Sequence, residues 1–102
     1  MPLIVEYSEK AKIDVRLISV WYRDKKDGLD DEFLLSLEAT VKAVQRNPLH
    51  FKMIHSTIRS ASLKRFPYKI YFVIKNDTVV ILSVFHTSRS PETILSRFKN
   101  ED

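Results

Sequence analysis

Apolar residues dominate two neighbouring stretches in the second half of the chain. Residues 66–74 and 78–86 are rich in aromatic and β-branched side chains, and the polar residues between them are typical of a tight turn. In both stretches the two alternating sets of side chains are largely apolar. The pattern therefore predicts a β-hairpin in a sheet that needs a cover on each face.

Two earlier stretches repeat their apolar residues at spacings of three and four, as amphipathic helices do. The first follows Ser8, a favourable N-terminal cap, and runs to about residue 26. The second begins at Asp30 and ends before Pro48, while Gly28 either stops the first helix or opens the turn. Because few residues join them, the helices are expected to form an antiparallel hairpin on one face of the sheet.

The other segments complete a β–α–α–β–β–β–α order. Residues 3–7 are expected to form a short strand, and residues 49–56 an irregular stretch. Residues 57–63 form a strand or a partly ordered ribbon, and residues 92–99 a last helix with Ser90 as its cap. The predicted fold class is α+β in a single domain, residues 1–102. It has an N-terminal strand, an antiparallel helical hairpin packed on a small antiparallel sheet, and a short C-terminal helix.

Composition narrows the kind of protein. The chain has no cysteine, which excludes disulfides, thiolate metal sites and a cysteine nucleophile. Its longest apolar run, residues 78–85, is too short to span a bilayer, and the N-terminus lacks the layout of a signal peptide. We therefore expect a cytoplasmic protein with no membrane partner.

The charge distribution is one-sided. From Lys42 to Asn76 there are eight basic residues and no Asp or Glu, whereas the carboxylates are concentrated in the helices before this segment. Such a region presents positive potential to an acidic partner, either a nucleic acid or an acidic protein segment. The alternative is a solvated basic surface with no dedicated partner.

The second face of the sheet is the expected interaction surface. The helical hairpin covers one face, and the last helix covers only part of the other. The apolar positions expected there are Tyr71, Val73, Val80, Leu82 and Val84, with Arg59, Lys64, Lys69 and Arg89 at the rim. This surface would suit an acidic amphipathic segment that folds as it binds. In the alternative arrangement, residues 49–56 fold over this face.

The run IRSASLKRFPYKIYFVIKNDTVVILSVFHTSRSP, residues 58–91, resembles the RelE/ParE superfamily of bacterial toxins. The likeness extends to VEYSEKAKIDV before the helical hairpin and to RNP at its end. It implies the toxin of a type II toxin–antitoxin, or plasmid stabilisation, module. A cognate antitoxin would wrap such a toxin, and operator DNA would be bound only through the antitoxin. Members of the superfamily either cut messenger RNA on the ribosome or, in the ParE branch, inhibit DNA gyrase.

The residues at the positions of the nuclease site favour the ParE branch. Attack by an RNA 2′-hydroxyl needs a general base, a general acid and cations. The matching positions here are Ser60, Ser62, Lys69, Thr87 and Thr93. Only Lys69 is charged, and no tyrosine follows Tyr71. We therefore expect a gyrase-binding inhibitor with no catalytic residues and no cofactor. Its candidate target-binding residues are Arg59, Lys64, Arg65, Lys69, His86 and Arg89.

A ribosome-dependent endoribonuclease is the alternative. It would use His86 as a base, together with Arg59, Arg65 and Arg89. Otherwise His86 is a strand-end histidine that bonds backbone or packs against Tyr71. A third possibility is a member that retains only complex formation and operator binding through the antitoxin.

No metal site is predicted. His50 and His55 lie in a region without carboxylates, so further ligands for a metal are lacking around them.

Overall fold

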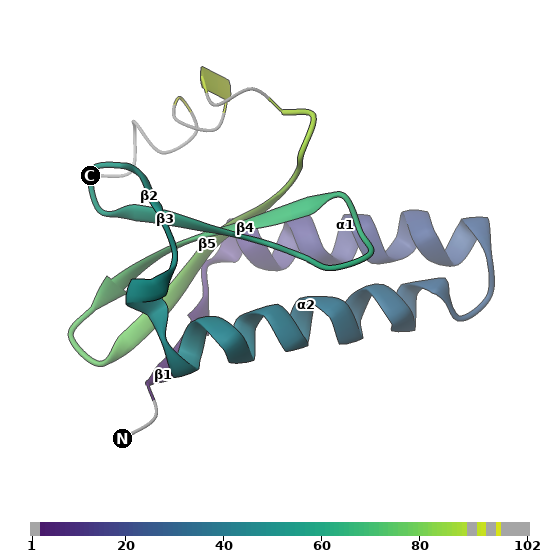
Figure 1. Cartoon of the computed structure of the whole chain (residues 1–102). Helices are drawn as coiled ribbons and strands as arrows, with labels where there is room; N and C mark the ends of the chain where they lie inside the picture. Colours follow the sequence, from purple (N-terminus) through teal and green to yellow (C-terminus); the bar gives the residue numbers. More distant parts are fainter. Residues whose placement is uncertain (1–2, 90–91, 94–95, 97–102) are drawn as a thin grey trace.

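A computed structural model describes residues 3–89, 92–93 and 96. Within these residues two long helices lie on a five-stranded sheet, as the sequence pattern predicts for the α+β class (Figure 1). The elements in chain order are β1 (Ile4–Tyr7), α1 (Glu9–Lys25), α2 (Leu29–Arg46), the 3-10 helix η1 (Pro48–His50), β2 (Met53–His55), β3 (Ile58–Ser62), β4 (Tyr68–Lys75) and β5 (Thr78–His86).

The strand order is β1-β5-β4-β3-β2. The pairs among β2, β3, β4 and β5 are antiparallel, whereas β1 runs parallel to β5 with Tyr7 opposite Ile81. The sheet is therefore mixed. A parallel pair needs a long connection, and the whole helical hairpin lies between β1 and the rest of the sheet in the sequence.

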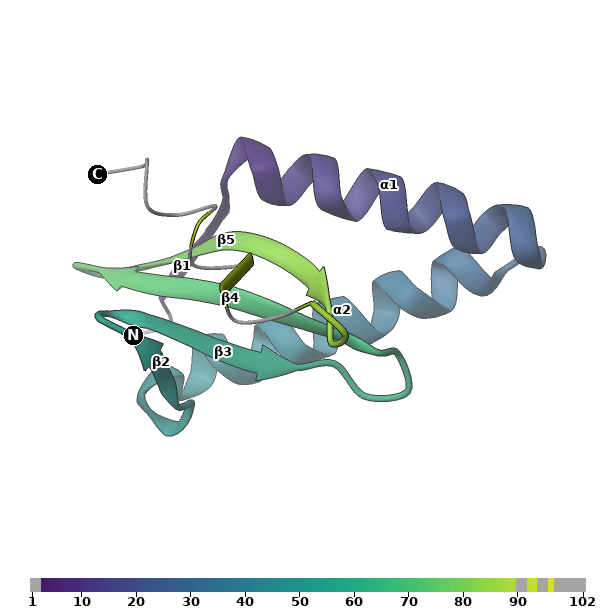
Figure 2. The ribbon, with the colours of Figure 1, turned by 90° about the horizontal axis from the view of Figure 1, so that it is seen from above.

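The helical hairpin forms as its end signals indicate. The Ser8 hydroxyl accepts a hydrogen bond from the Ala11 amide at 3.1 Å and caps α1. Gly28, which precedes α2, has a φ of 85°. This is a left-handed backbone conformation that favours glycine. Figures 1 and 2 show α1 and α2 side by side on one face of the sheet, which we call the hairpin face.

The main core lies between the hairpin and this face. Its completely buried members include Phe33 and Val44 from α2 and Ile70, Phe72 and Ile81 from the sheet. Aromatic rings also meet here, since Tyr22 of α1 stacks on Phe33 with ring centroids 5.7 Å apart. Burial of these side chains is the largest favourable contribution to folding.

A β-bulge in β5 changes the assignment of side chains to the two faces. Tyr71 pairs with Ser83 but the next residue, Phe72, pairs with Ile81, so Leu82 has no opposite residue. Val84 therefore lies in the main core, and Phe85 packs with Tyr71 on the other face, which we call the second face. The expectation that Val84 belongs to the second face is wrong, because simple alternation does not anticipate the bulge.

The second face is also less exposed than the pattern predicts. Tyr71, Ser83 and Phe85 are buried, and Val73 and Val80 are half-buried. Within the described part of the chain, the exposed large apolar side chains come instead from the helices and from the two edge strands. They are Ile4, Ile13, Leu17, Val20, Trp21, Leu34, Leu35, Leu49, Met53 and Ile54.

The segment 49–56 does not fold over the second face. It forms η1 and the short edge strand β2, and the Phe51 ring packs toward the main core, 6.1 Å from the Phe72 ring. The expected C-terminal helix over 92–99 lies mostly outside the described residues, with helical backbone at Glu92, Thr93 and Ser96. Among the described helices, none is both long and apolar enough to cross a membrane.

Candidate functional site

Arg59 lies on the hairpin face and not at the rim of the second face. In the register of β3 and β4 it is opposite Phe72, a core residue. Its guanidinium Nη1 donates a hydrogen bond of 2.6 Å to the Phe51 carbonyl. The side chain therefore ties the segment after η1 to the sheet, and one of its donors is already engaged within the chain.

Lys64 and Arg65 lie in the β3–β4 connection, beside α2. The Arg65 guanidinium Nη2 is 2.7 Å from Glu32 Oε1, and the Lys64 carbonyl accepts a hydrogen bond of 2.5 Å from the Ser36 hydroxyl. Arg65 also has a left-handed backbone with a φ of 72°. These contacts hold the connection against the N-terminal half of α2.

A groove of about 630 Å³ lies between α2 and this connection, and we call it the α2–β3 groove. Ala39 and Ala43 of α2 line it, and most of its surface is apolar. Its charged and titratable lining residues are Glu32, Arg46, His50, Lys64 and Arg65. Because Glu32 is paired with Arg65, the groove offers an excess of positive charge to a bound segment.

His86 ends β5 on the hairpin face. Its ring lies against Tyr68, with centroids 5.2 Å apart, so the packing against Tyr71 is wrong, whereas the backbone hydrogen bond given as the other possibility is present. Nδ1 accepts a hydrogen bond of 3.0 Å from the Ser88 amide, and the Ser88 hydroxyl is 2.8 Å away. The amide contact places the proton of a neutral ring on Nε2, so Nδ1 is not open to act as a base.

His86 shares a small hollow of about 210 Å³ with Asp14 and Arg89, between α1 and the end of β5. The Arg89 guanidinium carbon is 5.2 Å from the centroid of the Phe85 ring, a cation–π distance. Lys69 is opposite Phe85 in the β4–β5 ladder. Lys69 and Arg89 therefore lie at the end of the second face, beside Phe85.

The candidate residues do not converge. Arg59 is opposite Phe72 and His86 is opposite Tyr68, so they differ by four residues, or about 13 Å, along β4. They also belong to strands on opposite sides of β4, which adds to the distance. Only His86 and Arg89 share a hollow, so the four residues of the ribonuclease alternative form no single site.

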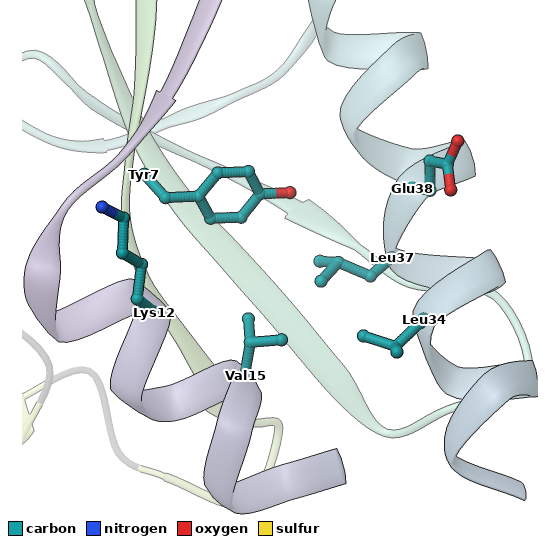
Figure 3. Close-up of a pocket in the computed structure, with 6 residues that line it drawn as sticks. All are labelled: Tyr7, Lys12, Val15, Leu34, Leu37 and Glu38. Atoms are coloured by element: carbon teal, nitrogen blue, oxygen red, sulfur yellow. The ribbon is translucent and has the colours of Figure 1, made fainter.

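Another pocket, of about 350 Å³, opens between β1 and the two helices (Figure 3). Tyr7 reaches across it toward α2, and Val15 and Leu37 point into the same space. Burial, and then the Glu38 carboxylate, raise the pKa of the Tyr7 hydroxyl. Tyr7 is therefore a neutral hydrogen-bond donor and not an ionised nucleophile.

Sequence patterning overlooks part of this arrangement. Asp14 is missed because it lies in a helix without a motif, yet its carboxylate accepts a hydrogen bond of 2.9 Å from the Val84 amide. Arg46 belongs to the basic run, but its place in the groove is missed, because the residues that line the groove with it come from segments far apart in sequence. Within the described part of the chain, no three His, Asp or Glu side chains gather where they could hold a metal ion.

Residues 5–91 match the model of the family described as ParE toxin of type II toxin-antitoxin system, parDE. The chain belongs to this toxin family. No curated protein sequence matches the chain.

Solved structures agree with the fold of a ParE-family toxin. A chain of the chromosomal ParDE system from P. aeruginosa superposes with a TM-score of 0.73 at 18% identity, covering 82% of this chain and 95% of that one. A chain of the RelBE2 toxin-antitoxin complex from Mycobacterium tuberculosis has a TM-score of 0.59 at 22% identity, covering 84% and 92%. Isolated E. coli RelE has a TM-score of 0.57 at 14% identity, covering 95% and 97%.

Proposed function

We propose that this type II toxin, when free of its antitoxin, acts in the cytoplasm by binding and inhibiting DNA gyrase. The observation that best supports this proposal is that the residues that RNA cleavage would require lie apart from one another. Arg59 is bonded to the Phe51 carbonyl, Arg65 is paired with Glu32, and Nδ1 of His86 is occupied by the Ser88 amide. A surface with separate cations suits binding better than proton transfer at one phosphate.

The test is a supercoiling assay with purified toxin and gyrase. Inhibition of supercoiling, or accumulation of cleaved DNA, is the expected result. Adding the cognate antitoxin should restore supercoiling. The absence of any effect at micromolar excess of toxin would contradict the proposal.

Messenger RNA cleavage on the ribosome is the second candidate. It is favoured by the hollow that brings His86 together with Asp14 and Arg89. Primer extension on translated messages would then reveal cuts at the ribosomal A site, and His86→Ala would abolish both the cuts and toxicity. If the toxin is instead a gyrase inhibitor, His86→Ala should inhibit supercoiling at a concentration within a few-fold of that of wild type.

We place the antitoxin in the α2–β3 groove. The groove combines an apolar lining with Arg46, His50 and Lys64, and its one acid is already paired with Arg65. An acidic amphipathic segment complements this combination of apolar floor and positive rim. The half-buried Val73 and Val80, with Tyr71 and Leu82 beside them, offer a smaller second contact on the sheet.

Charge reversal at the groove tests this assignment. Arg46→Glu should weaken the affinity for the protein encoded by the neighbouring gene by at least about tenfold at low salt. Lys75→Glu makes the same charge change at the exposed end of β4 and should leave the affinity nearly unchanged. Equal losses in the two variants would show a general charge effect and remove the groove assignment.

A further inference from the structure

The outward side of α1 carries an apolar stripe that no other described element covers. We define the α1 stripe as Ile13, Leu17, Val20 and Trp21, which are 48%, 64%, 39% and 53% exposed. These positions recur at spacings of three and four and so lie on one side of the helix. A continuous apolar stripe of this kind is typical of a helix that packs against another helix.

The α1 stripe is self-complementary about Leu17. Ile13 and Trp21 lie four residues before and after Leu17, and Lys10 and Asp24 lie seven residues before and after it. Both offsets return to the same side of a helix. A second copy of α1, laid antiparallel across a two-fold axis at Leu17, would therefore place Ile13 against Trp21 twice and Lys10 against Asp24 twice.

Lys10 and Asp24 also distinguish the antiparallel arrangement from a parallel one. A parallel copy in register would place each of them against its own like charge. Glu9 and Lys25 take no part, since Glu9 pairs with Lys12 at 3.2 Å and Lys25 lies over the Trp21 ring at 4.8 Å. The charges of α1 thus select one orientation and one register of a second α1.

The mixed charges also distinguish the α1 stripe from the α2–β3 groove. The groove has an excess of cations and fits an acidic partner, whereas the α1 stripe is flanked by one base, Lys10, and one acid, Asp24, at equal distances from Leu17. We infer that α1 is a homodimerisation surface, through which two copies of the toxin pack antiparallel about Leu17. This inference is independent of the target proposed above.

A helix pair of this length forms a small interface. The 17 residues of α1 span about 25 Å, so self-association is expected in the micromolar range, at the weak end of specific protein contacts. Trp21 is the only tryptophan in the sequence and lies in the stripe. Its emission should therefore shift to shorter wavelength as the concentration rises and the indole is covered.

The experiment is sedimentation velocity of the purified toxin from about 1 to 100 µM, with Trp21 emission recorded in parallel. Wild type should pass from monomer to dimer over this range. Leu17→Lys places two like charges at the two-fold axis and should weaken the dimer at least about tenfold. Leu49→Lys is the control, because Leu49 is 70% exposed in η1 and lies outside the stripe.

A charge swap tests the register itself. Lys10→Asp and Asp24→Lys should each weaken the dimer, whereas the double variant should restore it toward wild type. A monomer throughout the range, or a dimer that Leu17→Lys leaves intact, would overturn the inference. Loss of antitoxin binding in Leu17→Lys, without any change in self-association, would assign the α1 stripe to the antitoxin and also overturn it.

Discussion

The two faces of the sheet differ in what packs against them. On the hairpin face, α1 and α2 enclose a continuous core that includes Phe33, Ile70 and Phe72. On the second face, the buried cluster consists of Tyr71 and Phe85, with Ile58 packed against it. Among the described residues, most of the apolar burial is thus on one face, and side chains on the other face can vary at a lower cost in stability.

Adjacent residues of β4 make this comparison directly testable. Phe72 is completely buried in the main core, and Tyr71 is 6% exposed in the small cluster. Phe72→Ala should lower the free energy of unfolding by about 3–5 kcal/mol, because it removes a large ring from a core with little room to collapse. Tyr71→Ala should lower it by clearly less. Urea denaturation of both variants measures the difference, and equal losses would contradict the asymmetry of the two faces.

Alkaline pH probes the hairpin face through Tyr22. Burial, and then the neighbouring Tyr68, raise the pKa of the Tyr22 hydroxyl from 10.0 to about 12. The unfolded chain therefore loses this proton first, so the contribution of Tyr22 to stability is complete below pH 10 and is lost as pH rises toward 12. Near-ultraviolet absorbance should show a tyrosine that ionises about two pH units late.

Tyr22→Phe is the control for this titration. The variant should lose the late step in absorbance, and its stability should fall less between pH 10 and 12. An unchanged late step would assign it to another tyrosine, and Tyr7 and Tyr71 are the next to examine because burial also raises their pKa values.

Local patterns predict the elements of this fold well. The helical spacing, the Ser8 cap and the polar turn after β4 each act over a few residues, and the structure confirms all of them. The strand β2 is missed because its three residues are all exposed, so they show no alternation between a buried and an open side.

Long-range pairing is what the sequence leaves open. The parallel direction of β1 and the bulge at Leu82 depend on which strands meet, and the bulge moves Val84 into the main core and Phe85 out of it. The grouping of Arg59 and His86 in one site could not be judged from the sequence for the same reason. Arg59 and His86 have suitable chemistry, but only the register of three strands reveals that they are far apart. Charge was a better guide, since the basic run does contain Arg46, Lys64 and Arg65 of the groove.

Ser8 connects the start of α1 to the strand β5. Its hydroxyl accepts from the Ala11 amide and donates to the Leu82 carbonyl at 2.8 Å. Ser8→Ala removes both bonds and should lower the free energy of unfolding by about 1–2 kcal/mol. Ser8→Thr keeps both bonds and should recover most of the loss in urea denaturation. A fully stable Ser8→Ala variant would contradict the assigned role of this cap.

Ser83 concerns the second face alone and should give the smallest effect. Its side chain is completely buried, and among the described residues its hydroxyl finds no hydrogen-bond partner. A buried hydroxyl without a partner opposes folding, so Ser83→Ala should leave stability unchanged or raise it by up to about 1 kcal/mol. Ser83→Val, which adds volume beside Tyr71, separates relief of the hydroxyl from simple packing. If Ser83→Ala lowered the thermal midpoint by several degrees, the hydroxyl would have a partner in solution, and the second face would be better ordered than its small cluster indicates.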